Sequence, residues 1–107
     1  QADGLYVLPG AVDGHVHLSL RTSYGKTADD FRQGTIAAAH GGVTTLVDFV
    51  DPRPEQSLAD ALAERRAEAD GQAVIDFGLH MTLTGAWMAQ QKKTTVCFPL
   101  YLFMLVA

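Results

Sequence analysis

Pro9-Gly10-Ala11-Val12-Asp13-Gly14-His15-Val16-His17-Leu18 is the stretch that decides the interpretation of this chain, because it ends a short apolar run with two histidines. Side chains of a β-strand alternate between its faces, so His15 and His17 would share one face with Cα atoms about 7 Å apart. That spacing lets two imidazoles bind one metal ion at about 2.0–2.1 Å each. A His-X-His pair also occurs as two ordinary histidines on a polar strand face, and the pair by itself leaves both interpretations open.

Asp13 adds a second polar group to the same stretch, two residues before His15. In a regular strand it would lie on the histidine face. Its carboxylate would then accept a ring N–H and fix the tautomer, as the partners of metal-bound histidines do. We therefore predict His15 and His17 as metal ligands and Asp13 as the acceptor that orients them.

Composition excludes several classes of protein. The chain has 107 residues, of which 48% are hydrophobic and 19% charged, with a net charge of −4, as is typical of a globular protein. No basic face is evident, so nucleic acid is not an expected partner. One cysteine, Cys97, cannot form an internal disulfide, which fits a reducing cytoplasm. The most apolar stretch, residues 96–107, is too short for a membrane helix, which needs about 20 residues.

Strand and helix patterns alternate along the chain. Strands are predicted at residues 5–8, 11–17, 43–50 and 73–79, a loop at 18–26, and helices at 27–40 and 57–70. This βαβ series implies a parallel sheet with helices outside it. A closed (β/α)₈ barrel needs about 250 residues and places its chemistry at the C-terminal strand ends, where the histidine pair lies. We predict an α/β fold that forms part of such a TIM barrel over residues 9–107, and a chain that belongs to a longer protein.

The helix boundaries have local signals. Two capping-box-like pairs predict helix starts: Thr27 with Asp30, and Ser57 with Asp60. The expected helix stops are Gly41-Gly42 and Gly71. The predicted packed positions are Phe31, Gly34, Thr35, Ala38, Leu58, Ala61, Leu62 and Ala69. We interpret Glu64, Arg65, Arg66 and Glu68 as a solvated charged face, and His40, in a last helical turn, as structural.

The strand predicted at residues 73–79 places Ile75, Phe77 and Leu79 on one face and leads to His80. His80 could line a site at the strand end, although a hydrogen-bonded structural histidine is the favoured interpretation. The final apolar run could be a buried strand, and Pro99 argues against a central position for it.

Taken together, these motifs resemble a known enzyme family. The His15-Val16-His17 stretch resembles the first metal-binding motif of the amidohydrolase superfamily. The segments that follow, up to about Thr84, resemble the dihydropyrimidinase/hydantoinase branch: Asp29-Asp30-Phe31, Gly34-Thr35, Ala37-Ala38, Gly41-Gly42-Val43-Thr44-Thr45, Asp48-Phe49 and Asp76-Phe77-Gly78-Leu79-His80. Ser19 stands where relatives that act on carboxylate-bearing substrates typically carry Arg, and Phe49 follows Asp48. Both features favour a cyclic diamide substrate.

The resemblance implies a binuclear zinc hydrolase that opens dihydropyrimidine or hydantoin rings. His15 and His17 would bind the more buried metal, while two later histidines and a catalytic aspartate are expected beyond Ala107. The resemblance also implies a homotetramer. The resemblance also makes residues 1–8 the end of a small N-terminal β-sandwich domain that precedes the barrel.

One family feature is missing. The family has a carboxylated lysine that bridges both metals, in a pattern where this chain reads Leu100-Tyr101-Leu102-Phe103-Met104, and Lys92 and Lys93 lie too early to replace it. A truncated or frameshifted enzyme, a non-catalytic scaffold and a degenerate gene remnant all fit this departure. We expect these residues alone to bind zinc weakly, to lack hydrolase activity, and to self-associate through an open sheet edge.

Overall fold

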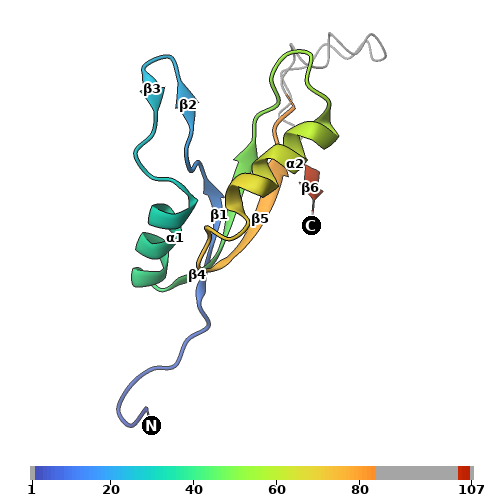
Figure 1. Cartoon of the computed structure of the whole chain (residues 1–107). Helices are drawn as coiled ribbons and strands as arrows, with labels where there is room; N and C mark the ends of the chain where they lie inside the picture. The colour runs from blue at the N-terminus through green and yellow to red at the C-terminus, as the bar shows by residue number, and fades with distance from the viewer. Residues whose placement is uncertain (1, 84–103, 107) are drawn as a thin grey trace.

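A computed structural model describes residues 2–83 and 104–106, in which a four-stranded sheet carries two helices (Figure 1). The strands are ordered β1 (Ala11–Val16), β4 (Val43–Val50), β5 (Asp76–Met81) and β6 (Met104–Val106). The first three are parallel, and β6 is antiparallel to β5. The parallel α/β sheet predicted from the sequence is thus confirmed.

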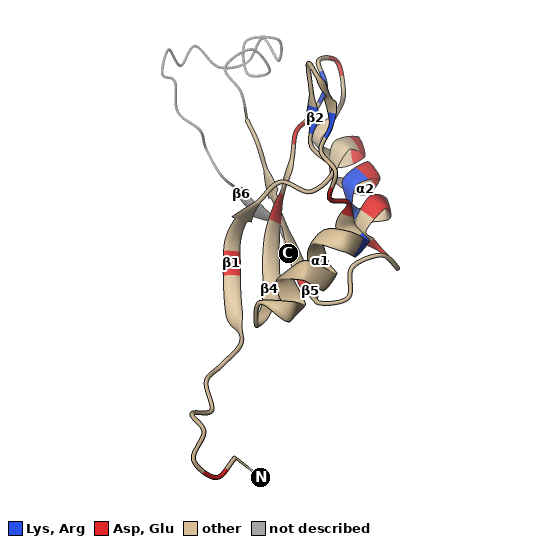
Figure 2. Cartoon of the chain, turned by 90° about the vertical axis from the view of Figure 1, so that its left-hand side faces the viewer, with Lys and Arg blue, Asp and Glu red and all other residues tan. Residues whose placement is uncertain are grey.

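Both helices lie on one side of the sheet (Figure 2). α1 (Phe31–His40) joins β1 to β4, and α2 (Leu58–Ala69) joins β4 to β5. Residues of β4 alternate between the two sides: Leu46 and Asp48 are fully buried under the helices, while Phe49 points to the other side, toward the two histidines where β1 ends. The helix-free side therefore presents the histidines that the sequence singled out.

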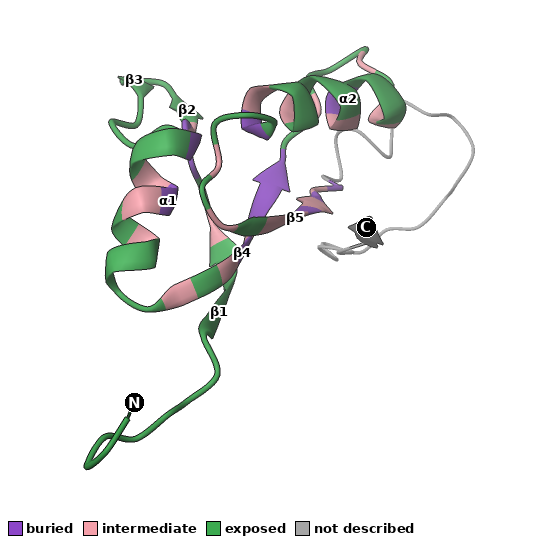
Figure 3. Cartoon of the chain, turned by 60° about the horizontal axis from the view of Figure 1, so that its bottom comes forward, coloured by how far each residue is buried: buried purple, intermediate pink, exposed green. Residues whose placement is uncertain are grey.

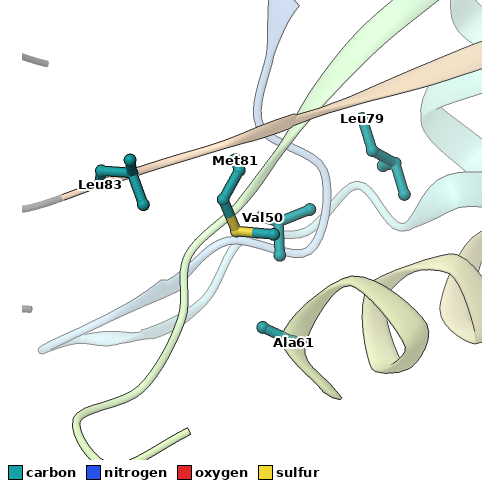
Figure 4. Packing of buried hydrophobic residues seen from close by; sticks show 5 residues of the cluster. All are labelled: Val50, Ala61, Leu79, Met81 and Leu83. Carbon is teal, nitrogen blue, oxygen red and sulfur yellow. The ribbon is translucent and has the colours of Figure 1, made fainter. Parts of the chain in front are cut away.

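The core consists of two clusters between the sheet and the helices. One joins Val50, Ala61, Leu79, Met81 and Leu83 (Figure 4), and the other joins Leu18, Phe31, Leu46 and Ala69. Buried positions concentrate in β4, β5 and the inner helix faces, whereas β1 and the segment before it are exposed (Figure 3). The helices pack mainly on β4 and β5 and leave β1 exposed at the edge of the sheet.

The helix starts are decided by side chains that accept backbone N–H groups. Asp30 caps α1 by accepting the Gln33 N–H at 2.8 Å, so the start predicted at Thr27 is wrong. Thr27 instead accepts the Leu20 N–H at 2.9 Å and lies outside the helix. Ser57 caps α2 by accepting the Asp60 N–H at 3.0 Å, as predicted. The predicted stop of α1 is also confirmed, with Gly41 as its cap and Gly42 at a φ of +83°.

Replacing Ser57 with Ala is expected to destabilise the chain by about 1 kcal/mol, because the Asp60 N–H loses its acceptor. Urea denaturation followed by circular dichroism measures the change. Ser23→Ala, in an exposed turn, is the control and should change stability little. Equal effects of the two substitutions would contradict this role for Ser57.

Two predictions for the N-terminal part are corrected. Residues 5–8 form no strand, because no described strand lies beside them to complete backbone hydrogen bonds, and their side chains are exposed. The segment predicted as a loop at residues 18–26 contains the hairpin of β2 (Arg21–Thr22) and β3 (Gly25–Lys26). The Thr22 hydroxyl closes its turn by donating to the Gly25 carbonyl at 2.8 Å.

The strand predicted at residues 73–79 begins later and ends later than expected, at Asp76–Met81. The reason is that the Ala73 N–H donates to the Ala69 carbonyl at 3.0 Å and the Val74 N–H donates to the Thr35 hydroxyl at 3.1 Å. These residues are therefore bound to the two helices and not to β4.

The remaining sequence predictions fall largely outside the described residues. Lys92, Lys93, Cys97 and Pro99 all lie there. In the predicted C-terminal strand only β6 is described, and its backbone pairs with β5. Among the described residues, none of the helices has the length and apolar character needed to cross a membrane.

Candidate metal-binding site at the strand ends

His15 and His17 bring two ring nitrogens together where β1 ends. Their Nε2 atoms are 3.2 Å apart, and both side chains are exposed. Two nitrogens bound to one tetrahedral zinc at about 2.0–2.1 Å would be separated by about 3.3 Å. The same separation suits an N–H···N hydrogen bond when one nitrogen is protonated. The separation of the two Nε2 atoms thus fits either a proton shared between them or one metal ion bound by both.

Phe49 lies against this pair and was not identified from the sequence as part of the site. Its ring centroid is 4.3 Å from that of His15 and 4.8 Å from that of His17, and the residue is only 5% exposed. The signal that could have found it is the alternation of β4, which puts Phe49 on the side opposite to Asp48. Its ring forms the apolar floor of the site.

His80 reaches the same floor from β5. It is in register with Phe49, and the two ring centroids are 5.5 Å apart with a tilt of 65°. Within residues 2–83 and 104–106, no group of three His, Cys, Asp or Glu side chains is arranged to hold a metal ion. His80 therefore contacts the site through Phe49, and the described donor set is the histidine pair.

Asp13 acts on the backbone of the pair. Its Oδ1 accepts the backbone N–H of His15 at 3.2 Å. The register between β1 and β4 shifts between Asp13 and Val16, so the regular alternation assumed from the sequence is interrupted there. Acceptance of a ring N–H by Asp13 stays a prediction.

Directly behind the pair lies a buried ion pair between Asp48 of β4 and Arg65 of α2. The Arg65 Nε donates to the Asp48 Oδ2 at 2.6 Å, and the Asp48 Oδ1 accepts the Leu18 N–H at 2.8 Å. Burial raises the pKa of the Asp48 carboxyl, against the opposing effects of the Leu18 N–H and the Arg65 guanidinium. Desolvation thus outweighs the attraction between the two groups.

Arg65 corrects the prediction of a uniformly solvated charged face on α2. Its side chain is only 13% exposed, whereas that of Arg66 is 67% exposed. The difference arises because Arg65 faces the sheet, where Asp48 needs a counter-charge. The signal in the sequence was Asp48 itself, a carboxylate within the apolar run of β4.

A pocket of about 160 Å³ opens beside His17 and Phe49, between the β2–β3 hairpin and α2. On its rim Arg53 donates two hydrogen bonds to Glu64, at 2.9 and 2.8 Å. These bonds lower the pKa of Glu64. The lining mixes charges of both signs, so the pocket does not favour an anion or a cation by charge alone.

Comparison with known proteins gives a consistent result. The sequence pattern of the amidohydrolase family matches residues 6–101. The D-hydantoinase of Geobacillus stearothermophilus is 43% identical over 83 residues, which cover 78% of this chain and 18% of that protein. The dihydropyrimidinase of Rattus norvegicus is 38% identical over 92 residues, which cover 86% of this chain and 17% of that protein.

Solved structures show the same similarity. The D-hydantoinase from Bacillus sp. AR9 superposes with a TM-score of 0.73 and 40% identity, over 85% of this chain and 20% of that one. A dihydropyrimidinase from Brevibacillus agri superposes with a TM-score of 0.68 and 38% identity, over 78% of this chain and 19% of that one. The chain thus spans about a fifth of the length of these proteins.

Proposed function

The chain belongs to the amidohydrolase family, and on that premise we propose that it carries the first metal-binding strand of a zinc-dependent hydrolase of cyclic amides. The observation that carries the proposal is the 3.2 Å separation of the Nε2 atoms of His15 and His17. It is the spacing that two imidazoles adopt on one zinc ion. The substrates proposed are dihydropyrimidines or hydantoins, after the names of the relatives.

Each described residue has a part in this proposal. His15 and His17 would hold the zinc at the end of β1, and the Phe49 ring lies against both imidazoles. Asp13 accepts the backbone N–H of His15, on the N-terminal side of the pair, and is proposed to orient a ring. A bound zinc polarises the substrate carbonyl and lowers the pKa of water. Two protein ligands are fewer than catalytic zinc sites usually have, so we propose that the chain is inactive without further ligands.

The architecture proposed around this site is a (β/α)₈ barrel of which residues 9–107 form the first units. Residues 1–8 are proposed to end an N-terminal β-sandwich. The position of His15 and His17 at a C-terminal strand end supports the barrel, because barrels carry their chemistry there. A cytoplasmic homotetramer is the proposed assembly.

A second candidate, a non-catalytic scaffold of the same family, is favoured by one feature of the sequence. The run Leu100-Tyr101-Leu102-Phe103-Met104 has no lysine where the family pattern has its metal-bridging one. A scaffold could lose zinc binding entirely, whereas the enzyme interpretation requires His15 and His17 to bind it.

Zinc titration of the 107-residue chain tests the proposal. We expect one zinc per chain, bound weakly, and an affinity at least about tenfold lower when His15→Ala and His17→Ala are combined, because both nitrogen ligands are lost. Isothermal titration calorimetry measures both quantities. His40→Ala, which removes an exposed histidine at the end of α1, is the matched control and should leave the affinity unchanged.

Equal zinc affinity of the parent and the double variant would contradict the metal-site proposal. Loss of binding in His40→Ala alone would place the zinc elsewhere on the chain. Either result would favour the scaffold.

A further inference from the structure

The guanidinium of Arg65 connects four parts of the fold. From α2 it donates through Nε to the Asp48 Oδ2 of β4, at 2.6 Å, and through Nη1 to the Glu68 Oε2 of its own helix, also at 2.6 Å. Through Nη2 it donates to the carbonyl oxygen of Leu18. Its Cζ lies 4.6 Å from the ring centroid of Phe31, the first residue of α1. One side chain therefore joins both helices, the central strand and the segment after β1.

Leu18 is held at both of its backbone polar groups by this ion pair. Its N–H donates to the Asp48 Oδ1 at 2.8 Å, and its carbonyl accepts from Arg65. The Leu18 N–H belongs to the peptide group that joins His17 to Leu18. Fixing that peptide plane fixes the backbone on the C-terminal side of His17.

The turn that follows His17 needs such support. Ser19 is buried and has a φ of +50°, a region that residues other than Gly and Asn disfavour. Its N–H donates to the Asp29 carbonyl at 2.7 Å. The Leu18 side chain lies against Gly34 of α1 so closely that a Cβ there would collide with it. The turn is thus an unfavourable conformation held by contacts from three sides.

We propose that the Asp48–Arg65 ion pair positions His17: by holding both backbone groups of Leu18, it keeps the imidazole of His17 at the separation from His15 that one metal ion requires. This inference rests on the proposed function, since it assigns the pair a purpose at the zinc site. Asp48 and Arg65 would act through the backbone of Leu18 and not as metal ligands. They are positioning residues.

Two observations favour positioning over simple stabilisation. Burial raises the pKa of the Asp48 carboxyl even with Arg65 beside it, so the charged form of Asp48 is held at a position where desolvation disfavours it. In addition, the contacts need the planar fork of Arg, which reaches Asp48, Leu18 and Glu68 from three nitrogens at once. A lysine has a single nitrogen and cannot span these acceptors in the same geometry.

The test compares Arg65→Gln and Arg65→Lys with Arg66→Gln. Arg66 is the matched control, because it lies on the same helix with a 67% exposed side chain and only a 3.7 Å contact to Asp70. We expect zinc affinity to fall about tenfold or more in Arg65→Gln, in the range found when groups that orient metal ligands are lost. Arg65→Lys should recover only part of that loss, and Arg66→Gln should match the parent.

Amide hydrogen exchange, measured by NMR on the metal-free chain, gives a readout that needs no zinc. In Arg65→Gln the Leu18 amide should exchange at least about tenfold faster, while the amides of β5 keep their protection. Contacts between the rings of His15 and His17, observed as nuclear Overhauser effects, should weaken in the same variant. A general loss of stability would instead raise exchange throughout the sheet.

Unchanged zinc affinity and unchanged Leu18 exchange in Arg65→Gln would overturn the inference. Should that variant unfold, Arg65→Lys decides, because it keeps the charge and lacks the fork. Should the parent bind zinc no better than the variant lacking His15 and His17, the proposed function fails separately. The exchange and ring-contact measurements then decide the inference. Loss of Leu18 amide protection and of the His15–His17 ring contacts in Arg65→Gln supports the positioning of His17. Retention of both overturns it.

Discussion

Replacing Asp48 with Ala is expected to lower the free energy of unfolding by about 3–5 kcal/mol, the typical cost of removing one partner of a buried ion pair. Asp48 is fully buried, and its loss removes the buried counter-charge of the Arg65 guanidinium, which keeps only its ion pair with the more exposed Glu68. The Leu18 N–H also loses its acceptor. Urea denaturation of the 107-residue chain, followed by circular dichroism, measures the effect. The loss is a large part of the stability of an ordinary domain, which is about 5–15 kcal/mol.

Asp76→Ala is the control for this substitution, because Asp76 is an exposed carboxylate at the start of β5. It should change stability by less than about 0.5 kcal/mol, as surface substitutions generally do. A second comparison combines Asp48→Leu with Arg65→Met. Because both charges leave together, the double variant should be more stable than either single one. Equal losses in Asp48→Ala and Asp76→Ala, or strict additivity in the double variant, would show that the two groups do not act as a pair.

The parts of the fold that follow local rules were predictable from the sequence. The β4 run is dense in strand-forming residues, as expected of a central parallel strand, and Ser57 precedes Asp60 at the spacing of a helix cap. The proximity of His15 and His17 was also predictable, because the two residues are separated by one position where β1 ends. Each of these signals lies within a few residues of the feature that it predicts.

What the sequence could not show depends on contacts between distant residues. Arg65 looked like part of a charged surface because its partners lie 17 and 47 positions away. Residues 5–8 have strand-forming side chains, yet a strand needs a neighbour, and composition cannot say whether one is present. The alternation of β4 indicates the side on which Phe49 lies, but its contact with His15 and His80 depends on the register of β4 against β1 and β5, which the structure provides.

Replacing Phe49 with Ala is expected to lower the free energy of unfolding by about 3–5 kcal/mol, as truncation of a buried Phe usually does. The ring is 5% exposed and lies against His15 and His17. Its removal opens a cavity directly under the pair, so the separation of the two Nε2 atoms should no longer be maintained. Urea denaturation measures the loss of stability, and zinc titration of the folded fraction measures the loss of the site.

Phe49→Leu separates the two effects, since it keeps most of the buried volume and removes only the flat aromatic surface. It should cost less than about 1.5 kcal/mol, the usual limit for volume-conserving exchanges in a core. If the aromatic floor orients the imidazoles, zinc affinity should still fall in this variant although the fold is kept. If Phe49→Leu binds zinc as tightly as the parent, Phe49 serves the site by its volume alone. The orientation of His17 would then depend on the backbone contacts of Leu18, which the Arg65 variants probe independently.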